Sequence, residues 1–112
     1  MKIDKKEIIC ILYLYPIASK KCAEIKEMFS YSLISESRSN ELNIDYKFYS
    51  YIVKKTKVWL NNLFEDEKEI ISLRFFKSMS FSQIAYKLNY KNHSSALKKI
   101  KSIIQKIEKC NL

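Results

Sequence analysis

The C-terminal stretch SFSQIAYKLNYKNHSSALKKIKSIIQKIEK, residues 80–109, contains two helix starts in close succession. Ser80 and Gln83 have the spacing of a capping box, which predicts that a short helix begins after Ser80. Asn92 can cap a second helix, which we expect to run from His93 to about Lys109. The apolar residues of this second helix recur every three or four positions and so form one stripe: Ala96, Leu97, Ile100, Ile103, Ile104 and Ile107.

Asn89 and Tyr90 separate the two predicted helices. Asn is the residue other than Gly that best tolerates the left-handed backbone conformation, so it suits a tight turn. Upstream, Asp66 and Glu69 have the spacing of another capping box and predict a further helix. The apolar residues of that helix are Ile70, Ile71, Leu73, Phe75 and Phe76. A short helix, a tight turn and a longer helix make up the helix-turn-helix plan.

The N-terminal half shows a different set of helix signals. A first helix is expected over Lys5–Tyr15, after a capping box at its start, and Pro16 disfavours its continuation. A second helix is expected over Ser19–Leu33. The stretch Ser35–Asn43 is rich in Ser, Asn and Glu and is typical of a loop. Asp45 can then cap a third helix, whose apolar stripe contains Phe48, Ile52, Trp59 and Leu63.

The length and composition agree with an all-α protein of one domain, or of one small domain with a helical extension. The chain has 112 residues, 47% of them hydrophobic, with one Pro and no Gly. Without Gly, phosphate-binding Gly-rich loops and tight type I′ hairpins are disfavoured. We therefore predict a helical N-terminal support, residues 1–57, followed by a C-terminal helix-turn-helix segment, residues 58–112.

The positive charge is concentrated in one part of the chain. The formal net charge is +9, from 21 Lys and Arg against 12 Asp and Glu. Ile70–Ile107 holds eight basic residues and no acidic residue, whereas the rest of the chain holds 13 basic and 12 acidic ones. Such asymmetry is what a polyanion-binding surface needs. A solvated lysine-rich face is the alternative, and charge alone favours neither.

The side of the last helix opposite its apolar stripe carries hydrogen-bonding and cationic groups and no carboxylate: Ser94, Ser95, Lys98, Ser102 and Gln105. Recognition helices usually read bases through their N-terminal residues. The candidates for base readout in duplex DNA are therefore His93, Ser94, Ser95 and Lys98. The candidates for phosphate contacts are Ser80, Lys87, Lys91, Lys99 and Lys101.

Several of the singled-out residues also have a plainer interpretation. His93, beside a helix cap, can be a capping or turn residue. The tyrosines of Tyr46–Tyr51 could stack on single-stranded bases, but aromatic residues at helical spacing are more often core. The acidic residues of Glu65–Glu69 could bind a divalent metal, yet a helix start attracts acidic residues through its dipole.

Cysteine usage and hydropathy argue against other classes of protein. Cys10, Cys22 and Cys110 lack metal-ligand and disulfide-framework spacing, so we expect no metal, no cofactor and a reduced, cytoplasmic protein. We find no nucleophile–base pair and no phosphate loop in the sequence, so we expect no catalytic residue and no enzyme. The longest uncharged apolar run, Ile8–Tyr15, has eight residues and is too short to span a membrane.

The run Asp66–Leu88, DEKEIISLRFFKSMSFSQIAYKL, resembles region four of bacterial sigma factors and the sigma-region-four-like helix-turn-helix regulators of phages, of the ArpU and RinA kind. The shared pattern is an acidic helix start, an aliphatic-Leu-Arg-aromatic sequence and a Ser or Thr cap before an Ile-Ala pair. The matching residues are Ile71, Leu73, Arg74, Phe75, Ser80, Ile84 and Ala85. The turn departs from the pattern, because Asn89 and Tyr90 stand where Gly and an aliphatic residue are usual.

The following run, YKNHSSALKKI, is similar to the start of the reading helix in the C-terminal DNA-binding domain of the DnaA initiator. That similarity implies DNA contacts for His93, Ser94 and Ser95.

Together these patterns predict a small regulator of transcription that places the helix from His93 in the major groove of double-stranded DNA. The alternative is an accessory protein that binds RNA polymerase through the sigma-like segment. No membrane partner is expected. A homodimer is a further open alternative, because four aromatic residues could serve either its interface or a monomer core: Tyr13, Tyr15, Phe48 and Trp59.

Overall fold

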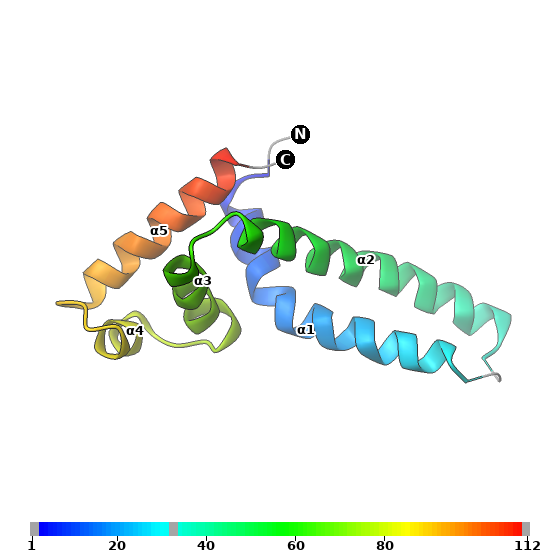
Figure 1. Ribbon diagram of the computed structural model, residues 1–112. Helices are drawn as coiled ribbons and strands as arrows, with labels where there is room; N and C mark the ends of the chain where they lie inside the picture. The colour runs from blue at the N-terminus through cyan, green and yellow to red at the C-terminus, as the bar shows by residue number, and fades with distance from the viewer. Residues whose placement is uncertain (1–2, 32–33, 111–112) are drawn as a thin grey trace.

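The computed structural model describes residues 3–31 and 34–110, and every regular element in these ranges is helical (Figure 1). The elements in chain order are α1 (Lys5–Phe29), α2 (Glu36–Asn61), α3 (Glu65–Ile71), a π-helical turn (Ser72–Phe76), α4 (Phe81–Lys87) and α5 (His93–Lys109). The expected all-α fold class is confirmed for this part of the chain. Helices α1 and α2 run antiparallel as a projecting arm, and the shorter elements form a head around α5 at one end (Figure 1).

Helix α1 is longer than the sequence predicts. Its start is as expected, because the Asp4 carboxylate accepts a hydrogen bond from the Glu7 backbone N–H at 2.9 Å. The predicted break at Pro16 and new start at Ser19 are wrong, since α1 continues through Pro16 to Phe29. The predicted end at Leu33 lies outside the described residues.

Packing explains why the proline does not end α1. An internal Pro removes one helical hydrogen bond and costs a helix about 3 kcal/mol. Buried residues lie on both sides of it, including Leu12 before and Ala18 after, and each is fully covered. Their burial offsets the cost. Figure 1 shows that α1 changes direction along its length, and an internal proline is an ordinary cause of such a bend.

Helix α2 also begins earlier than predicted. The expected loop over Ser35–Asn43 is wrong, because Ser35 caps the helix and its hydroxyl accepts from the Arg38 N–H at 3.2 Å. Asp45 is an interior residue rather than a cap. The Ser and Asn residues cost a few tenths of a kcal/mol each as helix formers. Leu42 in this segment is buried, and its burial stabilises the helix. The polar composition of the segment does not indicate this.

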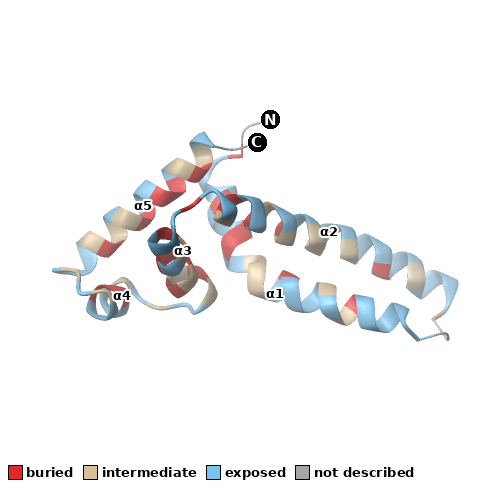
Figure 2. Ribbon diagram, in the orientation of Figure 1, coloured by how far each residue is buried: buried red, intermediate tan, exposed pale blue. Residues whose placement is uncertain are grey.

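The head contains most of the core. Figure 2 shows buried residues on α3, α4, α5 and the first part of α1, whereas the outer arm is mostly exposed. The C-terminal part of α2 adds Ile52 and Trp59 to the same cluster. The head contributes Ile70, Ile71, Leu73, Phe75, Ile84, Ala85, Ala96, Ile100, Ile103, Ile104 and Ile107. Helix α5 is thus held against both α1 and α3.

Of the two capping boxes predicted in the head, one is confirmed and the other lies two residues earlier than predicted. The Ser80–Gln83 box is confirmed, with reciprocal bonds of 3.1 and 2.9 Å. The box predicted for Asp66 and Glu69 is wrong by two residues. The Glu67 carboxylate accepts instead from the Phe64 N–H at 2.9 Å, and α3 begins at Glu65.

The end of this helix and the following turns also have specific geometry. The expected α-helix through Phe76 ends at Ile71, and Ser72–Phe76 continues it as a wider π-helical turn, in which Lys77 N–H bonds to the Ser72 carbonyl at 2.9 Å. Asn89 has a φ of 59°, which confirms its left-handed conformation. Ser78 shares this conformation, with a φ of 55°, which no local pattern predicted.

Candidate nucleic-acid interface

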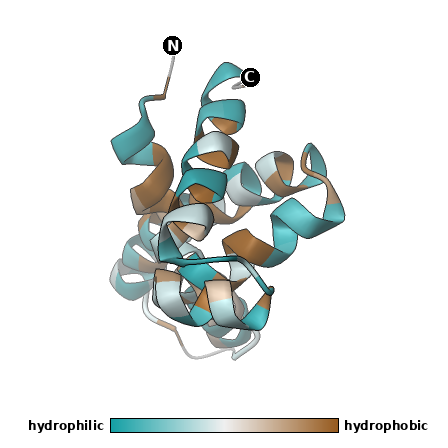
Figure 3. Cartoon of the chain, turned by 90° about the vertical axis from the view of Figure 1, so that its left-hand side faces the viewer, coloured by the Kyte–Doolittle hydropathy of each residue, from teal (hydrophilic) through white to brown (hydrophobic). Residues whose placement is uncertain are grey.

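Helix α5 has one face in the core and one face toward solvent. Asn92 caps it as expected, accepting from the Ser95 N–H at 3.0 Å, and the predicted bounds His93–Lys109 are confirmed. Its buried residues are Ala96, Ile100, Ile103, Ile104 and Ile107. In Figure 3 the helix that leads to the C-terminus alternates between hydrophilic and hydrophobic bands, as such a helix should. The exposed outer face contains Ser94, Lys98, Lys101, Ser102 and Gln105.

One flank of α5 faces the acidic start of α3. Lys106 Nζ lies 2.8 Å from Glu67 Oε1, and Lys99 Nζ lies 3.9 Å from Asp66 Oδ2. Burial raises the pKa of Glu67, but hydrogen bonds from Lys106 and from the Phe64 backbone, with the charges of Lys106 and Lys99, outweigh it. The net pKa of Glu67 is below its ordinary value. The cations on this flank are therefore matched by carboxylates of the same chain.

The outer face of α5 has no such neighbours. Lys98 and Lys101 form no ion pair with any carboxylate in residues 3–31 and 34–110. Because successive residues of a helix differ by about 100°, these two lysines lie away from the flank that holds Lys99 and Lys106. The structure thus divides the lysines of α5 into a neutralised set and a set that faces solvent.

The four predicted base-reading residues lie on the first turns of α5. His93, Ser94 and Lys98 are exposed. Ser95 is half-buried, and both its N–H and its hydroxyl donate to the Asn92 side-chain oxygen, at 3.0 and 3.3 Å. Ser95 therefore helps to cap α5. To donate to a base, its hydroxyl would first have to break its hydrogen bond with the Asn92 side chain.

The five predicted phosphate-binding residues are spread over α4, the following turn and α5. Lys87, Lys91 and Lys101 are exposed. Ser80 is exposed, and its hydroxyl oxygen accepts from Gln83 N–H, which leaves the hydroxyl hydrogen able to donate elsewhere. Lys99 is only partly exposed, and Asp66 competes for its ammonium group.

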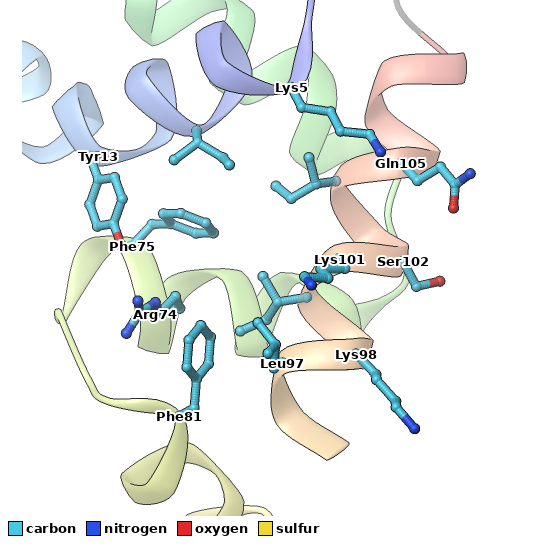
Figure 4. Close-up of a pocket in the computed structure, with 13 residues that line it drawn as sticks. Lys5, Tyr13, Arg74, Phe75, Phe81, Leu97, Lys98, Lys101, Ser102 and Gln105 are labelled. Atoms are coloured by element: carbon cyan, nitrogen blue, oxygen red, sulfur yellow. The ribbon is translucent and has the colours of Figure 1, made fainter. Parts of the chain in front are cut away.

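A groove of about 710 Å³ borders the outer face of α5 (Figure 4). Its floor is apolar and comes from α1, the π-helical turn, α4 and α5, with Ile9, Phe75, Phe81 and Ile104 among the lining residues. Its rim is cationic and includes no carboxylate: Lys5, Arg74, Lys98 and Lys101. In Figure 4, Lys5 extends toward Gln105, and Arg74 lies beside Phe81.

Arg74 and Lys5 line this region but were not among the predicted DNA contacts; Arg74 was named only for the resemblance to sigma region four. The Arg74 guanidinium stacks 3.9 Å from the centroid of the Phe81 ring and donates to the Met79 carbonyl at 3.0 Å. Arg74 is one of only two arginines in the chain, and this rarity could have marked it as a candidate site residue. Lys5 is brought to the groove by the fold of α1, which no local pattern indicates.

Two other classes of site, a metal centre and a membrane-spanning helix, are not found in residues 3–31 and 34–110. Within the described ranges, no three His, Cys, Asp or Glu residues are grouped so that they could hold a metal ion. No described helix combines the length and the apolar character needed to cross a membrane. Comparisons with protein-family models, with curated proteins and with solved structures found no match for this chain. The resemblance to sigma region four therefore stays a prediction.

Proposed function

We propose that the protein binds duplex DNA and regulates transcription, with α4 and α5 acting as a helix-turn-helix and α5 entering the major groove. The observation that carries this proposal is the outer face of α5, where Lys98 and Lys101 stand beside hydroxyl and amide groups without a carboxylate partner. A surface that approaches phosphates must be free of carboxylates, and the fold confines the acidic residues of α3 to the other flank.

The dimensions and chemistry of α5 suit this role. Seventeen residues make a helix about 25 Å long, and the major groove, about 12 Å wide, admits an α-helix. His93, Ser94 and Lys98 would meet base edges near the start of α5. Lys87, Lys91 and Lys101 would contact phosphates on either side. The resemblance to sigma region four and to the DnaA reading helix supports the same orientation.

Duplex binding at several salt concentrations tests the proposal. With about five phosphate contacts, the slope of log affinity against log salt should be near −4. Selection from a pool of random duplexes should enrich a motif. Replacing Lys98 and Lys101 with Ala should make the slope shallower by about 1, because Lys101 is a phosphate-contacting cation, and should weaken enrichment of the motif, because Lys98 is a base-reading one.

A matched pair of substitutions supplies the control. Lys6 and Lys20 are exposed lysines of α1, and changing both to Ala removes the same charge away from α5. This variant should keep the slope of the unmodified protein. If the two double variants lose affinity equally, binding follows net charge and the outer face of α5 is not the reading surface.

The groove beside α5 favours one second candidate function, binding to RNA polymerase as an accessory protein. An apolar floor with a cationic rim fits an acidic amphipathic segment of another protein. A substitution at Ile9, which lines the groove and is about one-third exposed, distinguishes the two functions. The substitution Ile9→Asp should weaken binding to purified RNA polymerase measured without DNA. Unchanged duplex affinity in the same variant would show that the groove serves the polymerase and not DNA.

A further inference from the structure

The groove beside α5 has the size and the lining of a binding site for a small amphipathic anion. Its volume of about 710 Å³ lies within the range of roughly 300–1,000 Å³ that is typical of small-ligand sites. The charged residues of its lining are all cationic: Lys5, Arg74, Lys98 and Lys101. A neutral ligand would gain nothing from these cations, and a purely polar anion would leave the apolar floor exposed to water. An occupant that matches both features needs an apolar body and an anionic head.

The floor of the groove is held in shape by the core of the head. Phe75 is 4% exposed, and its ring packs edge-on against the ring of Tyr13, with 4.8 Å between the two centroids. Ile100 and Ile104 of α5 are also buried and line the groove from the other side. Ile9 and Tyr13 of α1 are 36 and 41% exposed, so apolar surface remains for a ligand to cover. The floor is therefore preformed, and its burial would stabilise an apolar ligand.

Arg74 is the cation best placed to bind the anionic head. Its guanidinium group lies 3.9 Å from the centroid of the Phe81 ring and donates through Nη1 to the Met79 carbonyl oxygen at 3.0 Å. These contacts fix the group, so little side-chain entropy is lost when it binds an anion. Arg74 forms no ion pair with any carboxylate of residues 3–31 and 34–110. A carboxylate can accept two parallel N–H bonds from a guanidinium group.

We propose that the groove binds a small carboxylate with an apolar alkyl chain, its head on Arg74 and its chain across the floor toward α5. Figure 4 shows Arg74 on one side of the groove and Lys98 and Lys101 on the opposite side. The aliphatic stems of these two lysines would cover the alkyl chain while their ammonium groups stay in water. Such a ligand would bind whether or not the protein binds DNA.

Titration of the ¹⁵N-labelled full chain with sodium decanoate, below the concentration at which it forms micelles, tests the site by NMR. The backbone amide signals of Phe75, Leu97 and Lys101 should shift together, with a dissociation constant of about 10–300 µM for a ligand of this size. The signals of Ile25 and Leu42, in the outer arm, should stay in place. A single saturating curve from the groove signals alone would identify one site.

Two related compounds test the two halves of the ligand separately. Hexanoate keeps the carboxylate but has a shorter chain, and each buried CH₂ group contributes up to about fourfold in affinity. Hexanoate should therefore bind at least about tenfold more weakly than decanoate. 1-Decanol keeps the chain but has no charge, and it should also bind about tenfold more weakly, because it loses the charged hydrogen bonds to the guanidinium group.

Substitution of the two arginines tests the head site. Arg74→Lys keeps the positive charge but loses the planar set of donors, so it should weaken decanoate binding about tenfold. Arg38→Lys is the matched control. Arg38 lies on α2, pairs with Glu41 at 3.1 Å and does not line the groove, so this variant should bind decanoate as the unmodified protein does.

A second pair of variants leaves Arg74 and its packing on Phe81 in place. Ile9→Asp puts a carboxylate on the wall of the groove and should weaken decanoate binding at least about tenfold. Ile17→Asp, at a residue of α1 that is 54% exposed and does not line the groove, is its control and should have no effect. Circular dichroism confirms that all four variants stay helical.

One consequence rests on the DNA-binding proposal. A bound carboxylate adds a negative charge to a groove that Lys98 and Lys101 also line, and that proposal assigns these lysines to DNA. A unit charge roughly 10 Å from a cation in water changes affinity about twofold. Saturating decanoate should therefore weaken duplex binding roughly two- to fourfold, whereas 1-decanol should not.

Three results would overturn the inference: no shift of the groove signals with decanoate, equal binding of decanoate and 1-decanol, or full binding by both Arg74→Lys and Ile9→Asp. The first result, together with binding of RNA polymerase that Ile9→Asp weakens, would mean that the groove holds a protein segment instead. Decanoate binding by a protein without duplex affinity would leave the inference standing and remove the proposed function.

Discussion

The contact between Glu67 and Lys106 joins α3 to α5, and it leads to a prediction about stability and pH. The Glu67 carboxylate is 10% exposed and accepts hydrogen bonds from Lys106 Nζ at 2.8 Å and from Phe64 N–H at 2.9 Å. The substitution Glu67→Gln keeps the shape and one acceptor oxygen but removes the charge. Lys106, whose ammonium also lies 4.2 Å from the Phe64 ring centroid, then loses its ionic partner.

The expected loss follows from the burial of the two groups. A hydrogen bond to a charged group contributes roughly 1.5–3 kcal/mol to stability. Because the Lys106 side chain is one-third exposed, solvent screens the pair and the lower end applies. We expect Glu67→Gln to lower the free energy of unfolding by about 1.5 kcal/mol at neutral pH, and Tm by about 6 °C.

The pH dependence has a definite sign. The pKa of Glu67 is lowered in the folded state, so the unfolded chain binds a proton at Glu67 more readily than the folded chain does. The stabilisation is complete above the ordinary Glu pKa, about 4.3, and is lost as the pH falls through the lower, folded-state pKa. The difference between the unmodified protein and Glu67→Gln should therefore be constant from about pH 5.5 to 8 and shrink below about pH 4.

Urea unfolding followed by circular dichroism at several pH values measures this difference. Glu65→Gln is the control, since Glu65 forms an exposed pair with Lys68 at 3.1 Å and its side chain is 91% exposed. That variant should change stability by less than about 0.5 kcal/mol. Equal effects of the two variants at neutral pH, or a difference for Glu67→Gln that widens as the pH falls, would refute the reasoning.

Two further predictions concern single positions in the fold. Asn89 has a φ of 59°, so Asn89→Ala should lower the free energy of unfolding by about 1 kcal/mol while Asn89→Gly does not; a harmless Ala variant would show that the turn relaxes. Thr56 is fully buried and its hydroxyl has no hydrogen-bond partner in the described structure, so Thr56→Val should raise the free energy of unfolding by about 1 kcal/mol. Thermal unfolding measures both, and a lower Tm for Thr56→Val would mean that the hydroxyl has a partner.

Features that depend on neighbours three or four residues apart were predictable from the sequence. The Ser80 and Asn92 caps, the bounds of α5 and the division of α5 into an apolar and a polar face all belong to this class. A cap is a bond between a side chain and a backbone N–H within one turn, so its residues are adjacent in the sequence. The same capping rule placed the start of α3 wrongly. Glu67 and Glu69 could each complete a capping box, and in the structure it is Glu67 that accepts the hydrogen bond from the Phe64 N–H.

Features that depend on distant residues were not predictable. Pro16 and the polar stretch after Ser35 are local signals against a helix, and packing between α1 and α2 outweighs both. The groove beside α5 requires Lys5 of α1 and Arg74 of the π-helical turn to line one cavity, and the neutralisation of Lys106 depends on a carboxylate 39 residues away in the chain. The division of the α5 lysines into paired and solvent-facing sets therefore required the tertiary structure.

The outer part of the α1–α2 arm has little core of its own. Buried Ile25 and Leu42 lie outside the main core cluster, so the outer arm has few covered side chains to hold its two helices together. Isolated helices are marginal in water, and most helix stability in proteins comes from packing of an apolar face. Over the same turns, Ile44, Phe48, Tyr51 and Val58 of α2 are about half exposed or more. The outer part of the arm therefore depends on the contacts between α1 and α2 themselves and receives little support from the core of the head.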